Sequence, residues 1–166
     1  MAQATAPRRT FVQAAALFGG SLALAITYLL SPASGPFRSL VERLLAQSTG
    51  TALSWVDPSV VVGATTVTIN GFAAQVIPAC TGLFTTAVFL AAVIAYPTSW
   101  RHKLAGAAIG AFGLLAVNWT RIVSLLAIGG YWPSAFDVAH LLVWRSVVLL
   151  VAALLWLSWA RRAAHG

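Results

Sequence analysis

The chain has 166 residues, of which 60% are hydrophobic and only 8% are charged. Ordinary soluble domains carry roughly 25% charged residues, so this composition excludes a water-soluble globular protein and predicts an integral membrane protein. The formal net charge is +7, but the basic residues flank apolar segments, which argues against a nucleic-acid-binding protein. The single cysteine, Cys80, excludes an internal disulfide and a multi-cysteine zinc site, and we expect no metal or cofactor.

Four apolar segments are long enough to cross a bilayer, whose hydrocarbon core of ~30 Å needs about 20 helical residues. The sequence therefore predicts an all-α integral membrane protein, a four-transmembrane-helix bundle that forms a single domain over residues 1–166. The expected spans are residues 11–30, 80–96, 104–128 and 140–160. No A-x-A-like cleavage site closely follows the first segment, which favours an anchor over a removed signal peptide.

The extracytoplasmic segment, residues 31–79, separates the first two spans and carries two predicted elements. Apolar side chains between residues 37 and 45 recur at helical spacing and predict a helix of ~12–14 residues, too short to span a bilayer. We expect this helix to lie on the outer surface, with Ser39 and Glu42 spaced as a capping box. Asn70 and Gly71 separate two β-prone runs and predict a β-hairpin that leads into Cys80.

The distribution of lysine and arginine predicts the orientation in the membrane, because cytoplasmic loops carry the excess of basic residues. Six basic residues fall on one side of the predicted spans: Arg8, Arg9, Arg101, Lys103, Arg161 and Arg162. This side is assigned to the cytoplasm. The chain is therefore expected to be a multi-pass protein of the cell inner membrane, with both termini cytoplasmic.

Arg121 lies within the third predicted span, close to Asn118. An arginine inside a span costs ~2.5–3.5 kcal/mol on insertion scales, so it needs a partner or a hydrated cavity. Snorkelling toward the interface is the alternative, although Arg121 is eight residues, or ~12 Å of helix, from Gly129. Asn118 lies three residues earlier on the same helical face and is expected to help hold the guanidinium.

His140 begins the fourth predicted span. Asp137 is three residues earlier, where a carboxylate can fix the tautomer of the imidazole. An interfacial histidine in contact with water is the alternative reading. Arg145 is five residues further on, roughly 140° around the helix, so that it either snorkels or joins the site.

The predicted topology brings Cys80, Arg121 and His140 to the same, outer leaflet. These side chains can supply a thiolate nucleophile, an oxyanion donor and a proton shuttle. The start of a helix just after Cys80 would lower the pKa of its thiol, and Gly82 would allow close backbone approach beside it. The sequence therefore predicts a cysteine-based active site near the extracytoplasmic face.

Four stretches in this order, PACTGL, AYPTSWRHKL, NWTRIV and FDVAH, resemble the exosortase/archaeosortase family of membrane cysteine transpeptidases. The resemblance covers roughly residues 60–160 and is most specific at residues 79–82 and at Asn118 with Arg121. It implies that Cys80, Arg121 and His140 are the catalytic residues. The chain resembles a short form, of the exosortase H type, because common members have more spans.

The resemblance also implies a substrate class. Members recognise a C-terminal tripartite signal on secreted proteins, made of a short motif, a transmembrane helix and a basic cluster, and pass the protein to a membrane or surface acceptor. The expected partners are this sorting-signal helix and the lipid bilayer, with no nucleic acid. Two other functions stay open on sequence grounds, a non-catalytic membrane scaffold or assembly protein and a small anion transporter. The signal motif, the acceptor and the oligomeric state are not specified by the sequence.

Overall fold

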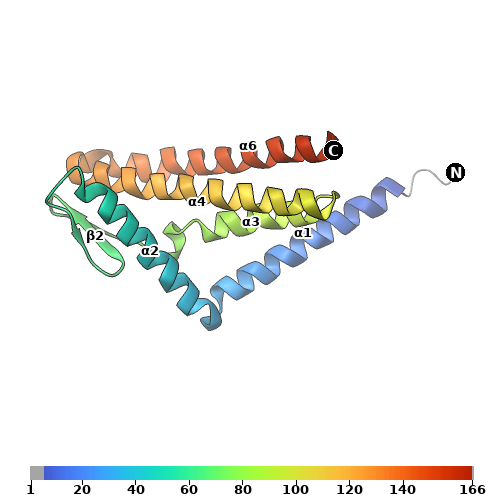
Figure 1. Cartoon of the computed structure of the whole chain (residues 1–166), viewed down its shortest axis with the longest axis horizontal. Coiled ribbons are helices and arrows are strands. Elements are labelled where there is room, and N and C mark those ends of the chain that lie inside the picture. The colour runs from blue at the N-terminus through green and yellow to red at the C-terminus, as the bar shows by residue number, and fades with distance from the viewer. Residues whose placement is uncertain (1–5, 166) are drawn as a thin grey trace.

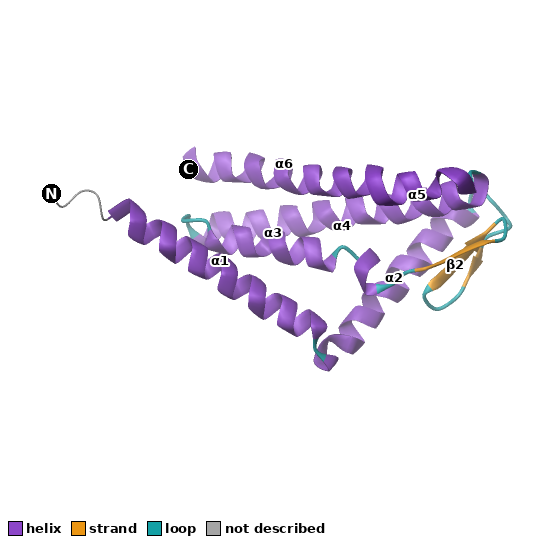
Figure 2. Cartoon of the chain, turned by 180° about the vertical axis from the view of Figure 1, so that it is seen from behind, coloured by secondary structure: helices purple, strands orange, loops and turns teal. Residues whose placement is uncertain are grey.

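A computed structural model describes residues 6–165 and shows a mostly helical chain with one small sheet (Figure 1). The predictions made for residues 1–5 and 166 lie outside the described residues. The main helices are α1 (Ala6–Leu30), α2 (Gly35–Ser54), α3 (Leu83–Ala95), α4 (Trp100–Tyr131) and α6 (Trp144–His165). Helices α3, α4 and α6 lie side by side, and α1 packs against α3 (Figures 1 and 2).

Three segments of the described chain are long and apolar enough to cross a membrane: Phe11–Leu30, Trp100–Tyr131 and Pro133–Ala164. The second predicted span, residues 80–96, contains the apolar helix α3, which has only 13 residues. At 1.5 Å per residue α3 is about 20 Å long, shorter than the ~30 Å hydrocarbon core. The structure thus supports a helical membrane protein with three such segments and does not by itself establish a four-span bundle.

Helix α1 is joined to α2 by a tight turn at Pro32–Ser34, and the two helices form a V (Figure 2). The hydroxyl of the fully buried Ser34 donates to the carbonyl oxygen of Leu29 at 2.9 Å, which closes the end of α1. Helix α2 has 20 residues, longer than predicted, and Ser39 lies inside it. The expected capping box is therefore wrong, since the Ser39 hydroxyl donates to the carbonyl of Pro36 within the helix.

The predicted hairpin is confirmed as β2 (Thr66–Ile69) and β3 (Phe72–Gln75), antiparallel with Ile69 opposite Phe72. Asn70 and Gly71 both have positive φ, 50° and 81°, as a two-residue type I′ turn requires. A short strand missed from the sequence, β1 (Val61–Val62), pairs with the other edge of β2. The chain leaves β3 at Gln75 and leads directly into the turn that contains Cys80.

Two apolar clusters hold the helices together. The first cluster joins α2, β2 and α4 through Ala46, Val67, Ile69, Ile122 and Leu126. The second cluster joins α3, α4 and α6 through Phe89, Val93, Leu114 and Trp159. Glycines on α4 allow this close packing, because a side chain at Gly106 or Gly110 would overlap the ring of Trp159 or Phe89.

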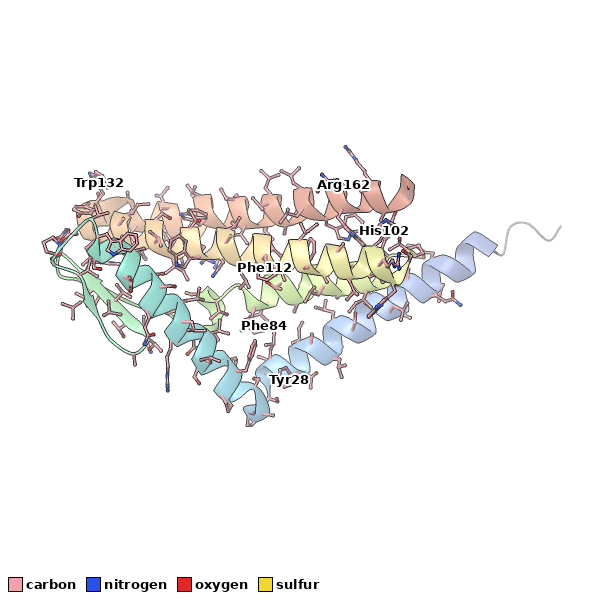
Figure 3. All side chains as sticks on the ribbon, in the orientation of Figure 1. Tyr28, Phe84, His102, Phe112, Trp132 and Arg162 are labelled. Carbon is pink, nitrogen blue, oxygen red and sulfur yellow. The ribbon has the colours of Figure 1, made fainter. Side chains whose placement is uncertain are left out.

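Basic residues gather at one end of the helices. The first turn of α4 carries Arg101 and Lys103, and the last turns of α6 carry Arg161 and Arg162. Figure 3 shows His102 and Arg162 at this end and Trp132 at the opposite end. The predicted grouping of these four basic residues at one side of the helices therefore agrees with the arrangement in space.

Candidate functional site

Cys80 ends a single turn of 3₁₀ helix, Pro78–Cys80, which connects the hairpin to α3. Two bonds hold this turn: Cys80 N donates to the carbonyl of Ile77 at 2.8 Å, and the buried hydroxyl of Thr81 donates to that of Pro78 at 2.7 Å. Helix α3 begins at Leu83 with Gly82 as its N-cap, so the half-buried Cys80 lies outside its first turn. The helix therefore begins three residues after Cys80 rather than directly after it.

Asn118 of α4 connects the Cys80 turn to the rest of the molecule. Its side chain is 1% exposed, and its Nδ2 donates to the carbonyl oxygen of Cys80 at 2.7 Å. Gly82 packs directly on this amide and has a φ of +75°. A Cβ at residue 82 would lie 2.9 Å from Asn118 Cγ, so both the backbone conformation and the available space require glycine. The close approach expected of Gly82 is therefore to Asn118.

Arg121 lies one turn further along α4 and is half-buried. From its spacing, Asn118 was expected to help hold the Arg121 guanidinium. Its side chain instead donates its hydrogen bond to the Cys80 carbonyl. Helix α4 thus carries the residue that holds the Cys80 turn and a guanidinium on neighbouring turns. This arrangement fixes the position of Arg121 relative to Cys80.

His140 lies in a π-helical segment, Ala139–Val143, that connects α5 (Phe136–Val138) to α6. π-Helical turns are rare and often occur at functional sites. The ring of Phe136 stacks on the imidazole with centroids 5.6 Å apart, and Phe136 also packs on Phe72 of β3 at 5.0 Å. His140 is therefore held by an aromatic row that begins in the hairpin.

Asp137 is the residue that the sequence suggests for orienting His140, but in the structure the ring of Phe136 lies against the imidazole. Asp137 is exposed, and within residues 6–165 no hydrogen bond joins it to the imidazole. Phe136 precedes His140 by four residues, the spacing at which side chains meet on a helix, so the signal was present in the sequence.

A single cavity of about 240 Å³ brings Cys80, Arg121 and His140 together. The remaining wall comes from β3 and the residues after it, from α4 and from α5: Ala74, Gln75, Val76, Ile77, Ile122, Leu125, Leu126 and Phe136. We call it the Cys80 cavity. Arg145 is exposed and is not part of its wall. A thiol, an imidazole and a guanidinium facing one largely apolar cavity can support nucleophilic attack, proton transfer and oxyanion binding.

Comparison with known proteins is informative at the level of the family. A family model described as a transmembrane exosortase (Exosortase_EpsH) matches residues 5–158. The chain belongs to the transmembrane exosortase family. No curated protein and no solved structure gives a match. The resemblance recognised in the sequence is thereby confirmed, and the residues that form the Cys80 cavity all lie within the matched region of this exosortase family member.

Proposed function

We propose that the chain is a membrane cysteine transpeptidase that cleaves the C-terminal sorting signal of secreted proteins. The observation that carries this proposal is that Cys80, Arg121 and His140 line the same cavity. Membership of the transmembrane exosortase family supports the same reaction class. The product is transferred to a membrane or surface acceptor.

In the proposed first half-reaction His140 takes the proton of the Cys80 thiol. The thiolate attacks the carbonyl carbon of the scissile peptide bond, and Arg121 donates hydrogen bonds to the oxygen as it becomes anionic. The C–N bond then breaks, and the His140 imidazolium gives its proton to the leaving amine. The secreted protein is left as a thioester on Cys80, while the sorting-signal helix departs.

In the second half-reaction an amine of the acceptor attacks the thioester carbonyl. His140 takes the proton of this amine, and Arg121 again binds the oxyanion. The C–S bond then breaks, and the His140 imidazolium gives its proton to the sulfur, which regenerates the thiol. Water in place of the amine gives hydrolysis. The apolar wall of the Cys80 cavity strengthens the electrostatic contribution of Arg121 by excluding bulk water.

We further propose that α3, with the turn before it, also crosses the membrane, as the second of four spans along the chain. We place the Cys80 cavity at the outer membrane boundary. Arg121 is 21 residues from Trp100, about 32 Å at 1.5 Å per residue, which is close to the ~30 Å hydrocarbon core. This depth removes most of the cost of an intramembrane arginine. The outer parts of α4 and α6 would then extend beyond the bilayer with α2 and the sheet.

The test is co-expression of the chain with a tagged secreted protein that ends in a motif, a transmembrane helix and a basic cluster. We expect Cys80→Ala, Arg121→Ala and His140→Ala each to leave the tagged protein at full length. Because Cys80 is the only cysteine, we expect a hydroxylamine-sensitive adduct that joins the wild-type chain to the tagged protein through Cys80. Cys80→Ser should lose that adduct.

Ser158→Ala is the matched control, since Ser158 is exposed on α6 and donates only to its own helix at Leu155. This variant should process the tagged protein as the wild type does. Normal processing by Cys80→Ala would overturn the transpeptidase proposal and favour a scaffold.

A further inference from the structure

The imidazole of His140 becomes positively charged in the proposed reaction, when it takes the proton of the Cys80 thiol. The cavity in which this happens already holds the Arg121 guanidinium, and none of the described residues that line it is acidic. The charged side chains that act on the imidazole are Arg121, Arg145 and Asp137, two cations and one anion. Even with the thiolate counted, the ionised cavity carries a net positive charge. The imidazolium therefore needs a further source of stabilisation.

The ring of Phe136 lies where it can stabilise a positive charge on His140. The two rings are stacked, with their centroids 5.6 Å apart and their planes at 24°. The face of an aromatic ring is negative, and it attracts a cation that lies over it within about 6 Å of the centroid. Phe136 therefore presents its negative face to the group that gains the proton.

Packing on the far side of Phe136 holds its ring in this position. Phe136 contacts Phe72 of β3, with ring centroids 5.0 Å apart. The ring of Phe72 in turn lies on Gly129 of α4, where an added Cβ would overlap it. The half-buried Phe136 is thus fixed between the hairpin and His140, and its face is oriented before the reaction begins.

We infer that Phe136 is a positioning residue of the proposed reaction, whose ring orients the His140 imidazole and stabilises its protonated form by a cation–π interaction. This inference rests on the proposed function and extends it by a residue that exchanges no proton itself. The proton still passes from the Cys80 thiol to His140 and from there to the leaving amine. Phe136 takes the part that a carboxylate has in Ser-His-Asp sites, where it orients the imidazole and stabilises the imidazolium.

The first test replaces Phe136 with mono-, di- and trifluorinated phenylalanine through a suppressed stop codon. Fluorine atoms at the ring edge keep the shape of the side chain nearly constant but make its face progressively less negative. We expect the logarithm of the processing rate of the tagged protein to fall steadily with the number of fluorines. The trifluorinated ring should slow processing by at least about threefold, since exposed cation–π pairs contribute a factor of this size.

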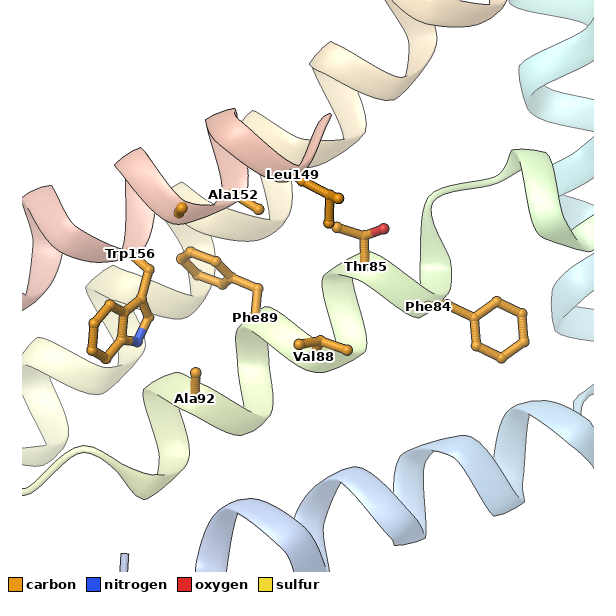
Figure 4. A pocket seen from close by; sticks show the side chains of 9 residues that line it. Phe84, Thr85, Val88, Phe89, Ala92, Leu149, Ala152 and Trp156 are labelled. Atoms are coloured by element: carbon orange, nitrogen blue, oxygen red, sulfur yellow. The ribbon is translucent and has the colours of Figure 1, made fainter. Parts of the chain in front are cut away.

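Phe89 of α3 is the matched control. It is buried in the second apolar cluster and lines a separate apolar hollow of about 370 Å³ between α3 and α6 (Figure 4). The same fluorinated residues at Phe89 change an aromatic ring in an apolar environment without facing His140. We expect this series to process the tagged protein at the wild-type rate.

The second test measures His140 itself and needs no substrate. Diethyl pyrocarbonate modifies neutral imidazole, and its rate at His140 is followed by peptide mass as a function of pH in the Cys80→Ser background. We expect fluorination of Phe136 to move the midpoint of this profile to lower pH, by roughly half a pH unit for three fluorines, which is a threefold change in proton affinity. His102, at the opposite end of the helices, is the internal reference and should keep its midpoint.

Three outcomes overturn the inference. They are a processing rate that does not change with fluorination of Phe136, an equal decrease in the Phe136 and Phe89 series, and a His140 midpoint that stays constant. The first and third reduce Phe136 to a space-filling residue, and the second indicates a general effect on folding. A shifted midpoint in a chain whose wild type processes nothing supports the cation–π interaction and overturns the transpeptidase proposal instead, so the two failures are distinguishable.

Discussion

The side-chain amide of Asn118 donates a hydrogen bond of 2.7 Å to the carbonyl oxygen of Cys80, across 38 residues of sequence. The amide is buried, and Gly82 leaves room for it. Arg121 follows on the next turn of the same helix. One rigid element therefore positions both the thiol turn and the guanidinium, as a preorganised site requires.

Replacing Asn118 with alanine should displace the Cys80 turn. The variant leaves the carbonyl of Cys80 without its donor, a loss of about 1–3 kcal/mol, so we expect a decrease in the processing rate of roughly 5- to 150-fold. The rate of Cys80 alkylation as a function of pH distinguishes repositioning of the thiol from general destabilisation. A wild-type alkylation profile and a wild-type processing rate would contradict this role of Asn118.

Gly82→Ala should impair the same turn for two separable reasons. The added Cβ would lie 2.9 Å from Asn118 Cγ, and alanine at a φ of +75° adds about 1–2 kcal/mol of backbone strain. Combining it with Asn118→Ala removes the contacts with Cγ and Oδ1, while the contact with the Cβ of residue 118 at 3.1 Å and the backbone strain stay. We therefore expect the two variants to be non-additive, with the double variant less impaired than the product of the single effects. Additive effects on the processing rate would show that the residues act independently.

The sequence was informative wherever the signal is local. The Asn70-Gly71 turn needs positive φ at both residues, and the apolar segments needed helices, so these elements were predictable. The sequence predicted that Cys80, Arg121 and His140 lie at the same end of their segments, because that argument requires only which end a residue occupies; that the three line one cavity is seen only in the structure.

Side-chain partners depended on details that spacing does not specify. Asn118 could have faced Arg121 on its own helix, and only the packing of the Cys80 turn on α4 gives it a different acceptor. The π-helical segment at His140 shifts the register of the helix by part of a turn, so the angle calculated for Arg145 from regular geometry could not hold. The length of α3 was likewise missed, because the 3₁₀ turn that ends at Cys80 replaces its first helical turn.

The two arginines of this region should differ sharply in their importance. Arg121 lines the Cys80 cavity, whereas Arg145 is exposed outside it. Removing one oxyanion donor typically costs 10²–10³-fold in rate, so we expect Arg121→Ala to lose at least a hundredfold in processing and Arg145→Ala less than tenfold. Arg121→Lys should recover only part of the activity, because an ammonium lacks the planar fork of donors. The comparison is made on processing rates at equal protein levels, and equal losses at the two arginines would refute the distinction.

Asp57 connects the outer ends of three elements. Its carboxylate accepts hydrogen bonds from the hydroxyl of Tyr131 at the end of α4, from the backbone N–H of Ser59 at 2.8 Å and from the amide of Asn70 at 3.2 Å. The bond from Tyr131, followed by the bond from Ser59, lowers the pKa of Asp57 from 3.8 to about 2. The ionised carboxylate therefore joins the turn of the hairpin to α4.

The protection of the hairpin amides from hydrogen exchange should decrease at low pH, because the pKa of Asp57 is lowered in the folded state. A carboxyl whose pKa is lower in the folded state stabilises that state fully above pH 3.8, and the contribution is lost as pH falls through about 2. We expect hydrogen exchange at the amides of residues 66–75 to be faster in Asp57→Asn than in the wild type at pH 6, and the difference to shrink toward pH 2. Asp137→Asn, an equivalent change at an exposed aspartate outside this network, should leave the exchange unaltered at every pH. The exchange rates of the wild type and of Asp57→Asn could instead differ by the same factor from pH 6 to pH 2. In that case the charge of the carboxylate does not help to hold the hairpin, and the variant loses only contacts that do not titrate.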